Sequence, residues 1–336
     1  MVNVIFSIFC NPFLFRDSEK SFFQKHNFQD IEITFIKEPL NISSKLSEQQ
    51  LEETDIVSVF IGSDVSAEVL KKFKNLRIVA TRSTGYNHID IDYCRNNNIT
   101  VFNVNDYGQK SVAQFTFGMI ISLVRNLLPA YLDMQNGILA HANYEGRNLN
   151  SMTLGIFGSG SIGEQVAKIA NFFNMKILVN SYTKNEEING FVEYVEKDEL
   201  LKRSDIISLH IPYTKENYHF LANEDFNKMK QGVYIINTAR GELLDIVALY
   251  ENLISGKVKG AGLDVLECEY LVGHEEQEYI KDLTPKSVTK KLLSFNNVLI
   301  TPHIAYNTRE SIEILLEVTF NNIRNFVKGM HENQVC

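Results

Sequence analysis

The chain has 336 residues, of which 44% are hydrophobic and 22% charged, and its formal net charge is −8 at pH 7. These values are typical of a folded globular protein and allow two domains of ordinary size. Basic residues are scattered rather than gathered in a stripe, which argues against nucleic acid or an anionic membrane as the main partner.

The cysteines and the first residues indicate the compartment. Cys10, Cys94, Cys268 and Cys336 have no paired spacing, so we expect free thiols in a reducing cytoplasm and no metal site. The start, MVNVIFSIFCNPF, has neither a basic segment nor a cleavage site. It therefore predicts a first strand and not a signal peptide.

Short apolar runs alternate with helical patterns along most of the chain. A first series of predicted strands comprises Val4–Phe9, Ile31–Phe35, Ile56–Phe60, Leu76–Thr81 and Thr100–Phe102. A second series comprises Thr153–Phe157, Lys176–Val179, Ile206–Leu209, Val233–Ile236, Gly260–Asp264 and Val298–Thr301. Because these runs are continuously apolar rather than alternating, we expect parallel sheets covered by helices on both faces, and hence two α/β domains.

One long predicted helix lies between the two series of strands, and another follows the second series. The first, from Ser111 to Leu128, is expected to begin with a capping box between Ser111 and Gln114, and its internal polar residues argue against a membrane span. The last, from Arg309 to Met330, has one apolar stripe and no strand after it. We expect it to return to the first domain, so that residues 1–104 and 305–336 form one domain and residues 105–304 the other.

A glycine-rich turn lies between the first strand and the first helix of the second series. Gly158 permits a tight turn, Gly160 allows the backbone to approach a pyrophosphate, and Gly163 allows the helix to pack closely on the strand. The N–H groups of Ser161 and Ile162 at the helix start favour an anion. The alternative is a glycine-rich turn without a ligand.

The end of the next strand is unusual for a dinucleotide site. A carboxylate about 20 residues after the glycines normally binds the ribose hydroxyls, but this strand continues into Asn180, Ser181, Tyr182, Thr183 and Lys184. Without that charge a 2′-phosphate is not repelled, and Lys184 would attract it. The alternative is NAD, with Asn180 or Ser181 bonded to the ribose.

Three further segments each follow a predicted strand. They carry Arg240 in NTARG, Asp264 with Glu267 and Glu269 in GLDVLECE, and His303 in TPHIA. The carboxyl ends of strands form the ligand crevice of a doubly wound sheet, so an arginine, a carboxylate and a histidine are expected to meet there. The alternatives are a structural ion pair for Arg240, a solvated acidic turn for the glutamates and a core histidine for His303.

The order of the glycine loop, HIP, NTARG, GLDVLECE and TPHIA resembles that of the D-isomer-specific 2-hydroxyacid dehydrogenases over nearly the whole chain. SVFIGSDVS and TRSTGYNHIDI are most similar to the D-lactate dehydrogenase branch, including the enzymes of vancomycin-resistance clusters. The resemblance implies two Rossmann-like or flavodoxin-like doubly wound domains flanking a cleft. It also implies a substrate domain built from both chain ends.

The resemblance further implies NAD(P)H-dependent reduction of a small 2-oxo acid, with pyruvate favoured, to the D-2-hydroxy acid. His303 would donate a proton to the carbonyl oxygen, Glu269 would hold the His303 ring, and Arg240 would bind the substrate carboxylate through its forked guanidinium. The spacing from Asp264 that is usual in the family favours Glu269 over Glu267.

Other site residues are implied only by the resemblance. Substrate contacts fall on the backbone of Thr84 and Gly85 and on Tyr107 and Tyr306. Cofactor contacts beyond the glycine loop fall on Ser181, Ile211, Pro212, Asn217, Thr238, Ala239 and Asp264. The family likeness also implies a homodimer through the cofactor domain.

Two departures and several rival functions stay open. The segment Tyr270–Ser294 is long and charged and is interpreted as a surface excursion. Gly108 and Gln109 stand where this branch usually has serine and proline after the tyrosine, so the preferred substrate stays open. A larger 2-oxo acid is one alternative substrate. A non-catalytic dinucleotide-sensing protein is an alternative from another class, whereas phosphoglycerate and formate dehydrogenases fit the chain less well.

Overall fold

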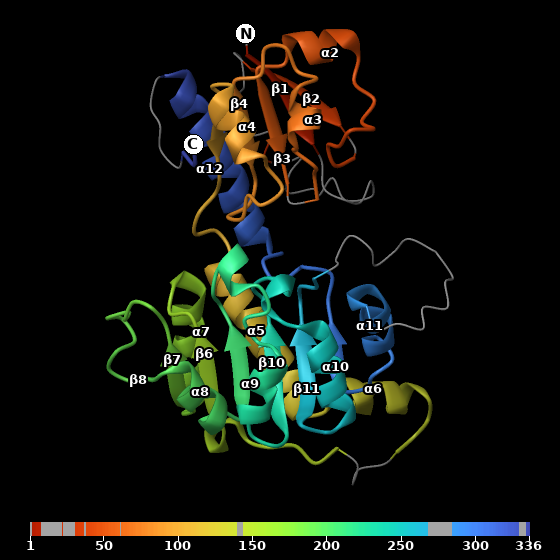
Figure 1. The fold of residues 1–336 in the computed structure, drawn as a ribbon, viewed down its shortest axis with the longest axis vertical. Coiled ribbons are helices and arrows are strands. Elements are labelled where there is room, and N and C mark those ends of the chain that lie inside the picture. The colour runs from red at the N-terminus through yellow and green to blue at the C-terminus, as the bar shows by residue number, and fades with distance from the viewer. Residues whose placement is uncertain are drawn as a thin grey trace. The chain divides into compact units, whose positions relative to one another are not determined.

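The computed structural model describes residues 2–7, 22, 31–36, 38–60, 62–139, 144–267, 284–328 and 334–336. The chain divides into two compact units, shown in Figure 1. Unit 1 comprises Met1–Tyr107 with Asn307–Cys336, and unit 2 comprises Gly108–Tyr306. The division predicted after residues 104 and 304 lies a few residues earlier in the chain.

Unit 1 contains a five-stranded sheet whose ladders are all parallel, in the order β2-β1-β3-β4-β5. Its strands are β1 (Val2–Ser7), β2 (Ile31–Ile36), β3 (Ile56–Val59), β4 (Ile78–Thr81) and β5 (Thr100–Phe102). Its helices are α2 (Glu48–Glu53), α3 (Ala67–Leu70), α4 (Ile91–Asn96) and α12 (Arg309–Val327).

Alternate residues of these strands point to opposite faces of the sheet and form two cores. Val57 and Val59 pack with Val69 and Leu70 of α3. Ile56, Ile78 and Phe102 pack on the other face with Ile323 of α12. The final helix therefore completes a core that begins in the N-terminal strands.

Unit 2 contains a seven-stranded parallel sheet in the order β12-β11-β10-β9-β6-β7-β8. Its strands are β6 (Thr153–Phe157), β7 (Lys176–Asn180), β8 (Glu193–Tyr194), β9 (Ile206–Leu209), β10 (Val233–Asn237), β11 (Val258–Leu263) and β12 (Val298–Ile300). The strand order reverses between β6 and β9, and such a switch point marks the ligand crevice of a doubly wound sheet.

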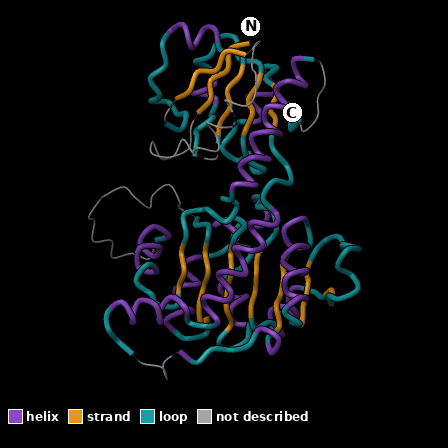
Figure 2. The backbone as a smooth tube through the Cα atoms, turned by 180° about the vertical axis from the view of Figure 1, so that it is seen from behind, coloured by secondary structure: helices purple, strands orange, loops and turns teal. Residues whose placement is uncertain are grey.

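Helices cover both faces of this sheet, as the opposite views in Figures 1 and 2 show. One face packs against α5 (Gln109–Val124) and α7 (Ser161–Phe172). The other packs against α8 (Lys197–Arg203), α9 (Asn223–Lys228), α10 (Ile246–Ile254) and α11 (Pro285–Leu292). The predicted two parallel sheets of the α/β class are confirmed.

The first long helix differs from its prediction. It begins at Gln109 after Gly108, so Ser111 lies inside the helix and the predicted capping box with Gln114 is wrong. It ends at Val124, and Asn126 adopts a left-handed φ of 51° before α6 (Leu127–Gln135) begins. No single described helix is long and apolar enough to cross a membrane; α5 and α6 pass that test only as a pair bent by 64°.

The segment Tyr270–Ser294 also differs from its prediction where it is described. Residues 268–283 lie outside the described part of the chain, but Pro285–Leu292 form α11, capped by the Thr284 side chain. Val288 and Leu292 are fully buried in the core. The interpretation of this part as a surface excursion is wrong, because two apolar residues four apart anchor it on α10.

Candidate functional site

The strand register of unit 2 sets the predicted site segments in one row. Ile300, Leu263, Asn237, Leu209, Phe157 and Asn180 are paired successively across β12, β11, β10, β9, β6 and β7. His303, Asp264, Arg240, Ile211, Gly158 and Ser181 follow these positions within three residues each. Because adjacent strands lie about 4.8 Å apart, the six segments emerge side by side along the carboxyl edge of the sheet.

Two of the three glycines in the predicted phosphate loop, Gly158 and Gly163, are required by the packing of the loop itself. Gly158 has φ +95°, and a Cβ there would lie 2.5 Å from the His210 carbonyl oxygen. A Cβ on Gly163 would lie 1.9 Å from the Gly158 carbonyl oxygen, whereas a Cβ on Gly160 would meet nothing within 4 Å. The turn therefore has no room for a side chain at Gly158 or Gly163, but it has free space beside Gly160, where α7 begins. This shape fits a dinucleotide pyrophosphate.

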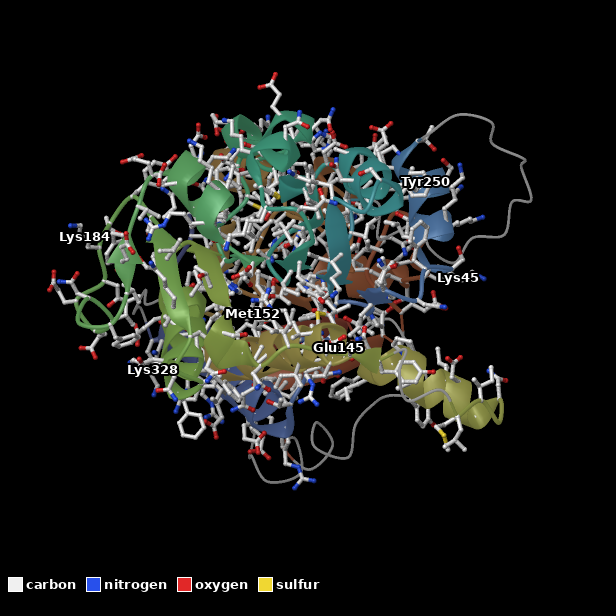
Figure 3. All side chains as sticks on the ribbon, turned by 90° about the horizontal axis from the view of Figure 1, so that it is seen from below. Lys45, Glu145, Met152, Lys184, Tyr250 and Lys328 are labelled. Carbon is white, nitrogen blue, oxygen red and sulfur yellow. The ribbon has the colours of Figure 1, made fainter. Side chains whose placement is uncertain are left out.

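The segment after β7 is tied to this loop. The Ser159 N–H donates to Ser181 Oγ at 3.3 Å, and Ser159 Oγ donates to the Thr183 carbonyl at 3.0 Å. Asn180 Nδ2 donates to the Val195 carbonyl at 2.9 Å. Lys184 lies at the outer edge of unit 2 in Figure 3, with its Nζ 5.7 Å from the centre of the Tyr194 ring. Both Asn180 and Ser181 are thus already engaged in the loop, Asn180 through Nδ2 and Ser181 through Oγ.

Arg240 stands on a turn built by its neighbours. Asn237 Nδ2 donates to the Arg240 carbonyl at 2.8 Å, and the Ala239 N–H donates to Asn237 Oδ1 at 3.0 Å. A Cβ on Gly241 would lie 2.0 Å from the carbonyl carbon of Leu266, so the next segment packs directly on this turn. Within the described residues the Arg240 guanidinium forms no salt bridge, and its Nη1 donates to the Ala239 carbonyl at 2.6 Å.

Asp264 organises the turn that carries His303. Its carboxylate accepts hydrogen bonds from Thr301 Oγ1 at 2.6 Å, from the Ile304 N–H at 2.9 Å and from the Ala305 N–H at 2.8 Å. Burial raises the pKa of Asp264 above its ordinary value, although these hydrogen bonds act in the opposite direction. The carboxylate predicted as a cofactor contact thus holds the TPHIA turn through both of its oxygens.

His303 itself is held in an uncommon backbone conformation. Its φ is +52°, and its N–H donates to the Asp264 carbonyl at 2.8 Å. Its ring lies 6.4 Å from the ring of Tyr306, edge to face. Left-handed backbone at a residue other than glycine costs free energy and is concentrated at functional sites.

The remaining predicted cofactor contacts flank the row. Thr238 is buried, and its Oγ1 lies 3.0 Å from Thr116 Oγ1 on α5. Asn217 closes the loop after β9 by donating to the Pro212 carbonyl and accepting from the Thr214 N–H. Ile211 lies beside Gly158, since a Cβ on that glycine would be 3.0 Å from Ile211 Cγ2.

The predicted substrate contacts fall partly in unit 1. Thr84 Oγ1 donates to the Val104 carbonyl at 2.8 Å, and Asn103 Nδ2 donates to the Thr84 carbonyl at 2.9 Å. The Gly85 carbonyl accepts from Ser83 Oγ at 2.6 Å. These bonds engage the carbonyls and side chains of the turn and fix its backbone. Tyr107 is half-buried in unit 1, and Tyr306 is buried in unit 2.

Glu269 and Glu267 are the two candidates for the partner of the His303 ring, and the structure describes only Glu267. Glu269 lies outside the described residues. The Glu267 carboxylate accepts a hydrogen bond from the Tyr218 hydroxyl and lies 3.2 Å from His219 Nε2. The sequence did not single out Tyr218 or His219, since their contact joins segments 48 and 49 residues apart. No group of three or more His, Cys, Asp or Glu that could hold a metal occurs among the described residues.

Comparisons with known proteins agree with this architecture. Residues 117–305 match the family profile of the D-isomer specific 2-hydroxyacid dehydrogenase, NAD binding domain. An aromatic 2-oxoacid reductase of Clostridium sporogenes is 39% identical over 84% of this chain and 86% of its own. The D-lactate dehydrogenase of Escherichia coli is 33% identical over 82% and 84%.

Solved structures are similar over almost the full length. The D-lactate dehydrogenase of Aquifex aeolicus, complexed with NAD and lactic acid, has a TM-score of 0.84 and 36% identity, covering 97% of this chain and 96% of its own. The profile covers more than half of the chain, and the relatives exceed 30% identity over most of it. The chain therefore belongs to the D-isomer-specific 2-hydroxyacid dehydrogenase family, in its D-lactate dehydrogenase branch, and is an NAD(P)-dependent oxidoreductase.

Proposed function

We propose that this protein reduces a small 2-oxo acid to the D-2-hydroxy acid with NAD(P)H, and that pyruvate is its preferred substrate. The proposal depends on the common register of β6, β10, β11 and β12. This register brings a phosphate loop, Arg240, Asp264 and His303 to one sheet edge.

Each residue has a chemical role in this reaction. A dinucleotide held by the glycine loop would supply the hydride for the carbonyl carbon. His303 donates a proton to the carbonyl oxygen, the task that histidine performs most often as a general acid. Arg240 binds the substrate carboxylate through two parallel N–H donors. Asp264 keeps His303 in place through the Ile304 and Ala305 N–H groups.

Glu269 is proposed as the partner of the His303 ring on the basis of family spacing alone. The engagement of Glu267 by Tyr218 and His219 supports this choice, because it gives the Glu267 carboxylate a different task. Thr84, Gly85, Tyr107 and Tyr306 are proposed as substrate contacts on the same basis of resemblance.

A larger 2-oxo acid is a second candidate substrate. It is favoured by the relatives, which include an aromatic 2-oxoacid reductase and a hydroxypyruvate reductase beside the D-lactate dehydrogenases. The test is steady-state turnover of pyruvate, hydroxypyruvate and phenylpyruvate with NADH and with NADPH, followed by chiral analysis of the product. A higher kcat/KM for phenylpyruvate would replace the first candidate by the second. No turnover of any of the three would favour the non-catalytic dinucleotide sensor.

We also propose a homodimer formed through unit 2 and a location in the cytoplasm. The dimer is supported by α6, which has no buried residue and exposes Leu127, Tyr131, Leu132 and Met134. Apolar side chains gathered on one surface element are typical of a covered interface. The location is inferred from the unpaired spacing of the cysteines.

A further inference from the structure

A cluster of four ionisable side chains links three loops at the carboxyl edge of unit 2. Tyr218 and His219 follow β9, Asp245 follows β10, and Glu267 follows β11. The Tyr218 and His219 rings stack with centroids 3.9 Å apart. The Tyr218 hydroxyl donates to Glu267 Oε1, while His219 Nε2 lies 3.2 Å from Glu267 Oε2 and Nδ1 lies 3.8 Å from Asp245 Oδ2.

The cluster is built at a cost in backbone conformation. His219 has φ +52°, which side chains other than glycine rarely adopt. This conformation persists because the His219 N–H donates to the Glu242 carbonyl at 2.8 Å and the ring is held at Glu267. A strained residue retained at a ligand-binding sheet edge points to a task beyond filling space.

The cluster contacts the Arg240 turn at two places, Gly241 and Glu242. The Leu266–Glu267 peptide packs on Gly241, since a Cβ there would lie 2.0 Å from Leu266 C and 2.3 Å from Glu267 N. The side chain of Glu267, only 11% exposed, is held by Tyr218 and His219. His219 is bonded in turn to Glu242, two residues after Arg240. The turn that carries the guanidinium is therefore packed against the Glu267 backbone at Gly241.

We propose that Tyr218, His219 and Glu267 are positioning residues that set the orientation of Arg240 toward the substrate carboxylate. This inference rests on the proposed function, which gives Arg240 that role. The Glu267 carboxylate transmits the effect, because it is bonded to the β9 loop while its own peptide packs on Gly241. Since a forked ion pair depends on orientation more than a point charge does, a small rotation of the turn would weaken binding of the substrate carboxylate.

The first test is Tyr218→Phe, which removes one hydrogen bond to Glu267 and keeps the stacked ring. We expect the KM for pyruvate to rise roughly 5- to 20-fold, and kcat and the Kd of NADH to change by a smaller factor than KM does. The matched control is Tyr144→Phe, because the Tyr144 hydroxyl also donates to a carboxylate, that of Asp133 on α6. An equal change of KM in the two variants, or no change in Tyr218→Phe, would overturn the inference.

A second pair of variants, both at Glu267, distinguishes a loss of kcat/KM caused by the missing link from one caused by poor folding. Glu267→Gln keeps an acceptor for Tyr218, whereas Glu267→Ala removes the link. We expect the glutamine variant to retain most of kcat/KM and the alanine variant to lose it, with the thermal midpoint of both measured. Equal losses in the two variants would contradict a positioning role.

A double-mutant cycle with Arg240→Lys separates this inference from the proposed function. If Tyr218 acts through Arg240, the effect of Tyr218→Phe on kcat/KM should shrink to about twofold or less in the Arg240→Lys background. Multiplicative effects would overturn the positioning role and leave the function intact. An unchanged kcat/KM in Arg240→Lys alone would remove Arg240 from the site, and both proposals would fall.

Discussion

His303 combines a strained backbone with a buried carboxylate beneath its turn. The Asp264 oxygens bind the N–H groups of Ile304 and Ala305, so the turn persists when the imidazole is removed. We therefore expect His303→Ala to remain folded and to lose about 10²- to 10⁴-fold in kcat, the usual contribution of a general acid. Single-turnover reduction with saturating NADH measures this, and a variant that turns over normally would show that another group supplies the proton.

The individual residues differ in how far the sequence could predict them. Arg240, Asp264 and His303 each follow an apolar strand, which suffices to place them at the edge of a parallel sheet. The task of Asn237 could not be foreseen, because its side chain folds back on the Arg240 carbonyl and the Ala239 N–H only after the turn has formed. The contact of His219 with Glu267 depends likewise on the tertiary fold.

The phosphate loop and its helix give a prediction at the scale of the element. In Gly160→Ala the new methyl group meets nothing within 4 Å, so the thermal midpoint should stay unchanged while the Kd of NADH rises at least about tenfold by obstruction of the pyrophosphate. In Gly163→Ala the methyl group would lie 1.9 Å from the Gly158 carbonyl oxygen, so α7 must shift. That variant should lose roughly 1–3 kcal/mol of stability.

Calorimetric unfolding and fluorescence titration with NADH distinguish these outcomes. Unfolding of the Gly160→Ala variant at a clearly lower temperature would show that this glycine serves packing. Unaltered NADH affinity in the Gly160→Ala variant would show that the pyrophosphate does not bind beside Gly160.

Strand positions were predictable where the chain is continuously apolar, and helix ends were less so. The parallel direction of the strands in unit 2 follows from continuously buried runs joined by helices. The break between α5 and α6 escaped prediction because Asn126 takes a left-handed conformation within an otherwise apolar stretch. Short β8 carries only Glu193 and Tyr194 and has no hydrophobic pattern of its own.

At the scale of the whole molecule, the choice between NAD and NADP depends on the segment after β7. No carboxylate ends this strand, and Lys184 is the first cation after it. We expect kcat/KM with NADPH to lie within about tenfold of that with NADH. We also expect Lys184→Ala to reduce only the NADPH value, and less so at high salt because the charge is screened. A strong preference of the natural protein for NADH would show that the missing acid does not admit a 2′-phosphate.

The assembly of unit 1 from both ends of the chain has a consequence for biosynthesis. Its five strands leave the ribosome before unit 2, yet Ile323 of α12, which shares a core with Ile56, Ile78 and Phe102, is made only after unit 2. Unit 2 can complete its sheet meanwhile, because all seven of its strands precede residue 307. During translation the early strands therefore lack the α12 part of their core until the whole intervening unit has emerged.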